Sequence, residues 1–394
     1  MLPDTTTVRA RWARVQENLR AADVDAMIVL KPQNTFYLSG YTPVIYSHPA
    51  LVVLPAEGEP VFVLHALRAH SSRRVSLITD IRPYGRWARE IGPDHWWQVL
   101  SDVLAERGLA GGRIGIEGEF LPHNHLARFT EALPGATFVD AGQALMRARY
   151  VKDAAELESL RVAASVADAG MDAVLTAVAE RRSEVEVSAA AMRAMQETWA
   201  TRHPDRIAID FGNLEGGVFN SLWAYSLVGD RVPMNSAPPT DRRPVDGEIQ
   251  WTVIWTAIDG MHTENERSVA VGRLDAERQA AFEALLEINE EVKPYLRPGL
   301  SCAEVYEAAR ASYVRHGYGD YLPGRIGHGL GLGPHEQPSL GPHDDLVLAP
   351  GMVLTIEPNL RIPSFGGLQH SDSVVITDTG FEYLTTTRRD LIQV

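Results

Sequence analysis

Cysteine is almost absent from this chain of 394 residues, which has only Cys302. A single cysteine excludes an internal disulfide framework and favours a reducing compartment. Positive charge is also scarce, because 37 lysines and arginines stand against 51 aspartates and glutamates, giving a formal net charge of −14. Nucleic acids and anionic membrane surfaces repel such a chain, so neither is an expected partner.

Long apolar segments are missing as well. No uninterrupted apolar run reaches the roughly 20 residues that cross a bilayer. The opening segment, MLPDTTTVRARWARV, lacks the apolar core of a secretory signal. These absences predict a cytoplasmic protein whose partner is a small-molecule substrate.

Two regions with different patterns follow each other along the chain. In residues 1–148 a helical pattern near the start is followed by short apolar runs such as AMIVL, ALVVLP and PVFVLH. This alternation predicts a sheet covered by helices. In residues 149–394 two helical segments precede a set of strands, and two further helical segments precede a second set. That order predicts an α+β domain with an internal duplication.

Acidic and histidine side chains alternate in MHTENERS, residues 261–268, directly after the strand-like run EIQWTVIWTAIDG. A period of two places His262, Glu264 and Glu266 on one face of a strand. Three interpretations are open for these residues: metal ligands, a proton-handling site, or a solvated edge strand with alternating charges.

The second region resembles the superfamily that includes methionine aminopeptidase, Xaa-Pro aminopeptidase (prolidase) and creatinase. Four stretches carry the resemblance: DGEIQWTVIWTAIDGMHTENERSVAVG, GRIGHGLGLGPHEQP, LAPGMVLTIEPNL and GGLQHSDSVVITDTGFEYLT. It implies a pita-bread catalytic domain at residues 149–394, preceded by a smaller creatinase/prolidase-type α/β domain at residues 1–148. Relatives with this N-terminal domain are usually dimers, so the resemblance also implies a homodimer, with His48 near the loop that enters the partner's cavity.

The metal site of the related peptidases is incomplete in this chain. In those enzymes two aspartates, a histidine and two glutamates hold two divalent ions. The first aspartate falls on Val253 and the last glutamate on Ser371, whereas Glu264, His328 and Glu357 occupy the other positions. Two neighbouring cations need shared anions, so a dinuclear centre is not expected. A single ion on the three remaining residues stays open, because one histidine and two carboxylates suit zinc or iron.

Creatinase is a metal-free relative, and two of its features recur here. Its glutamates match Glu266, which directly precedes Arg267, and Glu357. Its two histidines, however, fall on serines, so a different group must carry the proton. The serines are Ser236 and Ser371, and the nearest candidate carriers are His335 and His262. Strand alternation turns His370 away from the cavity and turns Gln369 and Ser373 towards it.

Clustered carboxylates without two metal ions repel one another, so at least one should have a raised pKa. We therefore expect a metal-independent, creatinase-like hydrolase that cleaves a C–N bond of a small cationic or amide-containing metabolite without a cofactor. The alternatives are a one-metal Xaa-Pro-type aminopeptidase or dipeptidase, and a lyase, cyclase or binding protein that uses the same cavity. The expected catalytic residues are Glu264, Glu266, Glu357, His328 and His335, and the expected substrate contacts are His262, Arg267, Ser371, Gln369, Tyr225 and His48.

Overall fold

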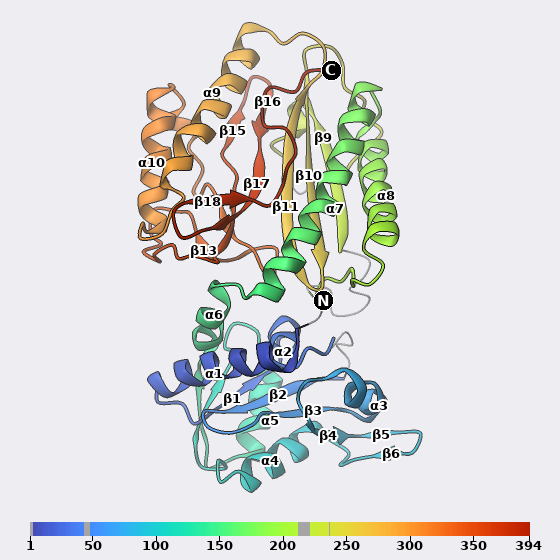
Figure 1. Ribbon diagram of the computed structural model, residues 1–394, viewed down its shortest axis with the longest axis vertical. Helices are drawn as coiled ribbons and strands as arrows, with labels where there is room; N and C mark the ends of the chain where they lie inside the picture. The colour runs from blue at the N-terminus through green and yellow to red at the C-terminus, as the bar shows by residue number, and fades with distance from the viewer. Residues whose placement is uncertain (1–2, 43–47, 212–220, 236) are drawn as a thin grey trace. The chain divides into compact units, whose positions relative to one another are not determined.

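The computed structural model describes residues 3–42, 48–211, 221–235 and 237–394, and the chain divides into two compact units (Figure 1). The first unit runs to Arg149 and includes Phe211, and the second begins at Tyr150. Each unit combines helices with a sheet of its own, which confirms the predicted α+β architecture with a smaller N-terminal domain.

A mixed six-stranded sheet forms the centre of the N-terminal unit. Its strands follow the order β4 (Asp80–Tyr84), β3 (Val61–His65), β2 (Leu51–Pro55), β1 (Ala26–Val29), β7 (Arg113–Ile116) and β8 (Thr137–Asp140). The short strands β5 (Arg86–Trp87) and β6 (Glu90–Ile91) pair separately. The helices of this unit are α1 (Thr5–Ala21), α2 (Pro32–Ser39), α3 (Ala66–Val75), α4 (Trp96–Glu106), α5 (His123–Ala132) and α6 (Gly142–Tyr150).

The C-terminal unit has an eight-stranded sheet flanked by two pairs of helices (Figure 1). The first pair, α7 (Ala154–Ala179) and α8 (Glu184–Arg202), packs against β9 (Leu222–Val228), β10 (Ile249–Ile258) and β11 (Met261–Ala270). The second pair is α9 (Ala276–Val292) and α10 (Cys302–Arg315). The later strands are β12 (His328–Gly329), β13 (Glu336–Ser339), β14 (Val353–Ile356), β15 (Asn359–Ile362), β16 (Gly366–Gln369), β17 (Ser371–Ile376) and β18 (Phe381–Tyr383).

The order of the elements repeats, helix pair then strands, as the sequence predicts. The two halves of the large sheet join where β11 pairs with β17. That pairing is short, consisting of Asn265 opposite Asp372 and Glu266 opposite Ser371. The predicted acidic strand therefore lies in the middle of the sheet, at the seam between the halves.

A tight turn fixes the register of the acidic strand. Asp259 and Gly260 connect β10 to β11, and both have positive φ values, 52° and 80°. An Asp-Gly pair in this conformation is the preferred two-residue hairpin turn, since its twist matches that of the strands. The resulting register places Trp255 opposite Glu264 and Val253 opposite Glu266. All residues of β11 are buried, which excludes the exposed edge strand as an interpretation.

Helix α7 is the one helix among the described residues that is long and apolar enough to cross a membrane. The segment is not an uninterrupted apolar run, because it contains charged residues such as Asp168 and Asp172. Its buried side packs against β10 and β11 in the core of the unit. Amphipathic burial of this kind is typical of a core helix.

Candidate active site

Four buried side chains meet at the seam of the large sheet. Glu264 and Glu266 come from β11, His328 from β12, and Glu357 directly follows β14. Carboxylate oxygens of the three glutamates all lie within 4.8 Å of one another. His335 forms a second such set with Glu264 and His328, so the structure brings together all five side chains expected to be catalytic.

Both carboxylate oxygens of Glu264 are held by neighbouring strands. Ser371 Oγ on β17 donates a hydrogen bond of 2.6 Å to Oε1, and the indole N–H of Trp255 on β10 donates one of 2.7 Å to Oε2. Hydrogen bonds to a charged acceptor are stronger than neutral ones. Glu264 is consequently the carboxylate of the cluster whose orientation is best defined.

The glycines beside His328 allow its backbone to pass between two other strands. A Cβ atom at Gly327 would lie 2.3 Å from the carbonyl oxygen of Thr355, and one at Gly329 would lie 2.4 Å from that of Gln337. No side chain fits at these separations, so the Gly-His-Gly sequence is required by close packing. The packing presents the His328 ring to the carboxylates.

The two ring nitrogens of His328 have different surroundings. Nδ1 lies 3.1 Å from the carbonyl oxygen of Gly329, which can only accept, so Nδ1 carries the proton of that bond. Nε2 is buried, has no hydrogen-bond partner among the described residues, and lies 3.5 Å from Glu264 and 3.6 Å from Glu357. Around a tetrahedral zinc with bonds of about 2.0–2.2 Å, ligand atoms lie about 3.4 Å apart. The two separations from Nε2 are therefore close to those between ligands of one divalent ion, and His335 offers a further ring nitrogen near Glu264 and His328.

Burial and mutual repulsion separate the pKa values of the three glutamates. Burial and the charges of Glu264 and Glu357 raise the pKa of Glu266 well above its ordinary value. Burial and the charge of Glu264 likewise raise the pKa of Glu357 to about 7. Burial alone would also raise the pKa of Glu264, but His328, Ser371 and Trp255 bring it down to about 2. The expectation of at least one raised pKa is confirmed.

The pKa values of the two histidines of the site shift in opposite directions. Burial opposes protonation of His328, but Glu264 and Glu357 outweigh it and raise the pKa of the ring. His335 lies beside it, with the ring centroids 4.3 Å apart. Although the His335 residue as a whole is exposed, desolvation of the packed ring and the neighbouring His328 lower its pKa to about 4. His335 is therefore neutral near pH 7.

Glu266 lies between the two positions that lack metal ligands. Val253 on β10 is its direct partner on one side, and Ser371 on β17 is its partner on the other. The Oε2 atom of Glu266 is buried and has no hydrogen-bond partner among the described residues. Neither Val253 nor Ser371 supplies a carboxylate that could bridge two metal ions beside Glu266. Two adjacent ions are therefore disfavoured.

A pocket of about 320 Å³ lies beside the cluster. Its walls include Trp223 and Trp255, whose rings are parallel with centroids 5.2 Å apart. Its polar side includes His262, which contacts Asp210 at 3.2 Å and the carbonyl oxygen of Gly331 at 3.1 Å. The remaining lining residues are Pro334 and His335. Through Trp255 and His335 the pocket reaches the cluster, and its volume suits a small ligand.

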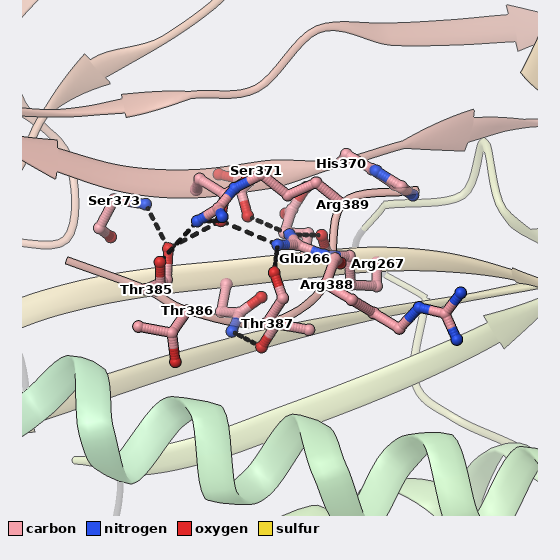
Figure 2. A network of polar contacts seen from close by, with 12 residues as sticks. Glu266, Arg267, His370, Ser371, Ser373, Thr385, Thr386, Thr387, Arg388 and Arg389 are labelled. Atoms are coloured by element: carbon pink, nitrogen blue, oxygen red, sulfur yellow. Dashed lines mark hydrogen bonds and ion pairs between the residues drawn. The ribbon is translucent and has the colours of Figure 1, made fainter. Parts of the chain in front are cut away.

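Arg267 occupies a structural position in place of the expected substrate contact. Its side chain is completely buried, and its five N–H donors all bond within the protein (Figure 2). The acceptors are the Asp372 carboxylate and four backbone carbonyl oxygens, those of Glu266, Ser371, Thr387 and Arg388. No donor of Arg267 is left for a substrate, because β11, β17 and the C-terminal segment use them all.

Strand alternation describes the neighbours of Ser371 correctly. His370 packs its ring against Phe282 at 5.5 Å, on the opposite side from the cluster, and burial lowers its pKa to about 3 (Figure 2). Gln369 accepts a hydrogen bond from Arg361. Ser373 Oγ donates a hydrogen bond of 2.9 Å to the backbone carbonyl oxygen of Glu264. These polar residues support the cluster from its edge.

The remaining expected contacts have mixed surroundings. Tyr225 is buried among aromatic rings, and its hydroxyl donates to the carbonyl oxygen of Asn235. His48 packs on His65 in the N-terminal unit, with centroids 4.3 Å apart, and its role towards a partner subunit stays a prediction. Ser236 lies outside the described residues.

Sequence reasoning misses several residues of the site. Trp255 could be found from strand alternation, because it shares a face with Val253 and is opposite Glu264. Arg325, whose Nε lies 3.6 Å from Glu357, belongs to the stretch GRIGHGLGLGPHEQP, but nothing in the sequence marks it as part of the site. The same holds for Arg361 of β15. Asp210 follows a weak strand pattern and reaches His262 only through the tertiary fold.

Comparison with known proteins gives two family matches. The pattern of metallopeptidase family M24 matches residues 158–378, more than half of the chain, and that of the creatinase/prolidase N-terminal domain matches residues 11–151. The Xaa-Pro dipeptidase of Pyrococcus furiosus is 25% identical over 385 residues, 98% of this chain and 100% of that protein. A Bacillus subtilis strain 168 protein is 27% identical over 384 residues, 97% of this chain and 99% of the relative.

Solved structures share the whole fold. A dipeptidase from Mycobacterium ulcerans superposes with a TM-score of 0.84 at 24% identity, and the match covers 100% of both chains. An Xaa-Pro dipeptidase from Bacillus anthracis also has a TM-score of 0.84, at 22% identity, covering 98% of this chain and 100% of that one. At these identities the likeness establishes the architecture.

Proposed function

Because this chain belongs to the metallopeptidase family M24 and carries a creatinase/prolidase N-terminal domain, we propose that it hydrolyses short peptides with one divalent ion. The family makes it a hydrolase of C–N bonds, and relatives along the whole chain carry the name Xaa-Pro dipeptidase. Dipeptides ending in proline are accordingly the first substrates to test. This proposal favours the one-metal alternative over the metal-independent reaction expected from the sequence.

One observation carries the proposal. The buried Nε2 atom of His328 has no hydrogen-bond partner among the described residues, although it lies 3.5 Å from Glu264 and 3.6 Å from Glu357. A bond between Nδ1 and a backbone carbonyl oxygen turns Nε2 towards the carboxylates, where a bound ion would displace any proton on Nε2, as in many metal sites. One histidine and two carboxylates suit zinc, iron or manganese.

The same residues do not fit two ions. A valine at position 253 has no ligand atom, and the serine at position 371 uses its hydroxyl as a donor to Glu264. Neither position offers the negative charge that two adjacent cations share. The proposed reaction therefore uses a single ion.

The chain's own residues divide the chemistry between them. A divalent ion held by Glu264, His328 and Glu357 would act as a Lewis acid on the scissile carbonyl group. Glu266 Oε2, which is buried and has no hydrogen-bond partner among the described residues, would take a proton from the attacking water and pass it to the leaving nitrogen. Trp255 and Ser371 hold Glu264 in place throughout.

The pocket beside the cluster would receive one residue of the peptide. Trp223 and Trp255 offer an apolar wall, and His262 with Asp210 offers a polar side. The neutral ring of His335 faces both His328 and Trp255, so it would contact the substrate without carrying its own charge. A volume of about 320 Å³ favours dipeptides over long chains.

The test combines metal analysis with a peptidase assay. Metal-depleted protein is loaded with manganese, zinc or cobalt, the bound metal is counted by mass spectrometry, and release of proline from Xaa-Pro dipeptides is followed. We expect one ion per chain and turnover that chelators abolish, with both lost in His328→Asn. Absence of turnover with every metal, or a count of two ions per chain, would overturn the proposal.

A metal-independent hydrolase remains the second candidate because of Glu266. Its unpartnered oxygen and its Glu-Arg sequence match the creatinase pattern, and a carboxyl group with a raised pKa can act as acid or base without a metal. Hydrolysis of a small C–N substrate that persists in metal-depleted protein with chelator present would favour this candidate instead.

A further inference from the structure

Three polar atoms around one row of side chains are buried and have no hydrogen-bond partner among the described residues. They are Oε2 of Glu266, the indole nitrogen of Trp251 and Nη1 of Arg361. Trp251 precedes Val253 by two residues on β10, so both face the same side of the sheet as Glu266. Arg361 stacks on Trp251 and therefore brings a positive charge to the residue two positions before Val253, on the face of the sheet that Glu266 occupies.

Arg361 is held in that position by two contacts. Its guanidinium carbon lies 5.5 Å from the centroid of the Trp251 ring, a cation–π contact. Its Nη2 donates a hydrogen bond to Gln369 on the paired strand β16. From there it interacts electrostatically with the carboxylates of Glu266 and Glu357. A guanidinium stays charged under all physiological conditions, unlike a histidine or lysine.

We propose that the guanidinium of Arg361 takes the place of a second divalent ion, as a fixed cation that neutralises Glu266. This inference rests on the proposed single-ion site. Three carboxylates then face one divalent ion and the guanidinium of Arg361, while Arg325 contacts Glu357 from the more exposed side. One change then explains both the missing carboxylates at Val253 and Ser371 and the presence of Arg361. Two exchangeable metal ions are replaced by one metal ion and one side-chain cation.

The competing explanation is that Arg361 only fills space against Trp251. The two explanations differ in what happens when the charge is removed and the shape is kept. If Arg361 acts by charge, its loss should make the cluster more negative, strengthen binding of the ion and destabilise the protein through Glu266. If it acts by packing alone, none of these effects should depend on Glu266.

The first experiment measures affinity for manganese in Arg361→Met, in Arg361→Lys and in the control Arg278→Met. Arg278 is a matched control because its guanidinium also stacks on a ring, that of Phe365, at 5.1 Å. Removing a repelling charge near the ion should tighten manganese binding about tenfold or more in Arg361→Met. Arg361→Lys and Arg278→Met should stay within about threefold of the wild type. Unchanged affinity in Arg361→Met would overturn the proposal.

The second experiment needs no metal, so it separates this inference from the single-ion site. Thermal unfolding midpoints are compared for metal-depleted wild type, Glu266→Gln, Arg361→Met and the double variant. Arg361→Met should lower the midpoint by at least about 4 °C, and adding Glu266→Gln should restore most of the loss. Additive losses would show that the two side chains are not coupled and would sink the inference. Wild type that binds no ion, with the coupling intact, would contradict only the single-ion site.

Discussion

Ser371 donates a hydrogen bond of 2.6 Å to Oε1 of Glu264, from the position that the sequence resemblance assigns to a metal-binding glutamate of the related peptidases. In this chain the Ser371 side chain orients a carboxylate. Trp255 completes the arrangement by holding the other oxygen of Glu264. The site is therefore reorganised around Glu264, and its residual ligands are not simply leftovers of a larger centre.

Replacing Ser371 with alanine should leave Oε1 of Glu264 buried without a partner. An unsatisfied buried acceptor costs about 1–3 kcal/mol, so we expect the free energy of unfolding to fall by that amount. Urea denaturation measures the loss. Ser364→Ala is the control, because Ser364 also donates to a glutamate, Glu277, but on the exposed surface. Equal stability of the two variants would mean that the Ser371 hydrogen bond does not support Glu264.

Much of the site follows from local patterns in the sequence. The Asp259–Gly260 turn and the alternation of β11 place Glu264 and Glu266 on one face, and the glycines around His328 mark close packing. The turn sets the register, so these features need no long-range information. The predicted rise in a carboxyl pKa follows from the number of acidic groups alone, and the structure confirms it for Glu357.

The parts that sequence reasoning misses depend on contacts between distant segments. The same local pattern would place Arg267 beside a substrate, but Asp372 and the C-terminal segment capture its donors. Arg361 and Trp251 are 110 positions apart in the sequence, and only the fold brings them together. Which carboxylate has a lowered pKa could not be predicted either, because that depends on Trp255 and the fold around Glu264.

Two variants should identify the third ligand of the ion. Oxygen atoms of Glu357 and a ring nitrogen of His335 are both placed for this role, because each belongs to a set with Glu264 within 4.8 Å. We expect Glu357→Gln to weaken manganese binding at least about 100-fold, as loss of a direct ligand should exceed the effect of an outer partner. His335→Asn should change it less than about threefold, because the residue is exposed and lies at the pocket wall. The reverse order in equilibrium dialysis would assign the ion to His335.

The stability of metal-depleted protein should fall as the pH rises from 6.5 to 8. Below this range the lowered pKa values of His335 and His370 act in the opposite direction, because the unfolded chain then holds the protons. The pKa of Glu357 is about 7 in the folded chain, against 4.5 for an ordinary glutamate. Between these values the folded chain holds a proton that the unfolded chain has released, so folding becomes less favourable with rising pH. The raised pKa of Glu266 acts in the same direction. Glu264, with a pKa of about 2, loses its contribution only in acid, below this window.

Thermal unfolding at several pH values measures this effect. We expect the midpoint to drop by about 2–4 °C between pH 6.5 and pH 8. Glu357→Gln should flatten the dependence, because it removes a titrating group while keeping the shape of the side chain. Saturating manganese should reduce the drop, since the ion replaces the proton on its ligands. A midpoint that rises over this range in metal-depleted protein would contradict the assigned directions.

The two stacked tryptophans should have separable effects on catalysis. Trp255→Phe keeps a ring beside Trp223 but removes the N–H group that donates a hydrogen bond of 2.7 Å to Glu264. A hydrogen bond to a charged group contributes about 1.5–3 kcal/mol, so kcat should fall roughly tenfold to 100-fold. Trp223→Ala removes a wall of the pocket without touching Glu264, so KM should rise while kcat changes little. Steady-state kinetics with one Xaa-Pro dipeptide measures kcat and KM for both variants. If Trp255→Phe changed only KM, the Trp255 N–H group would not position Glu264.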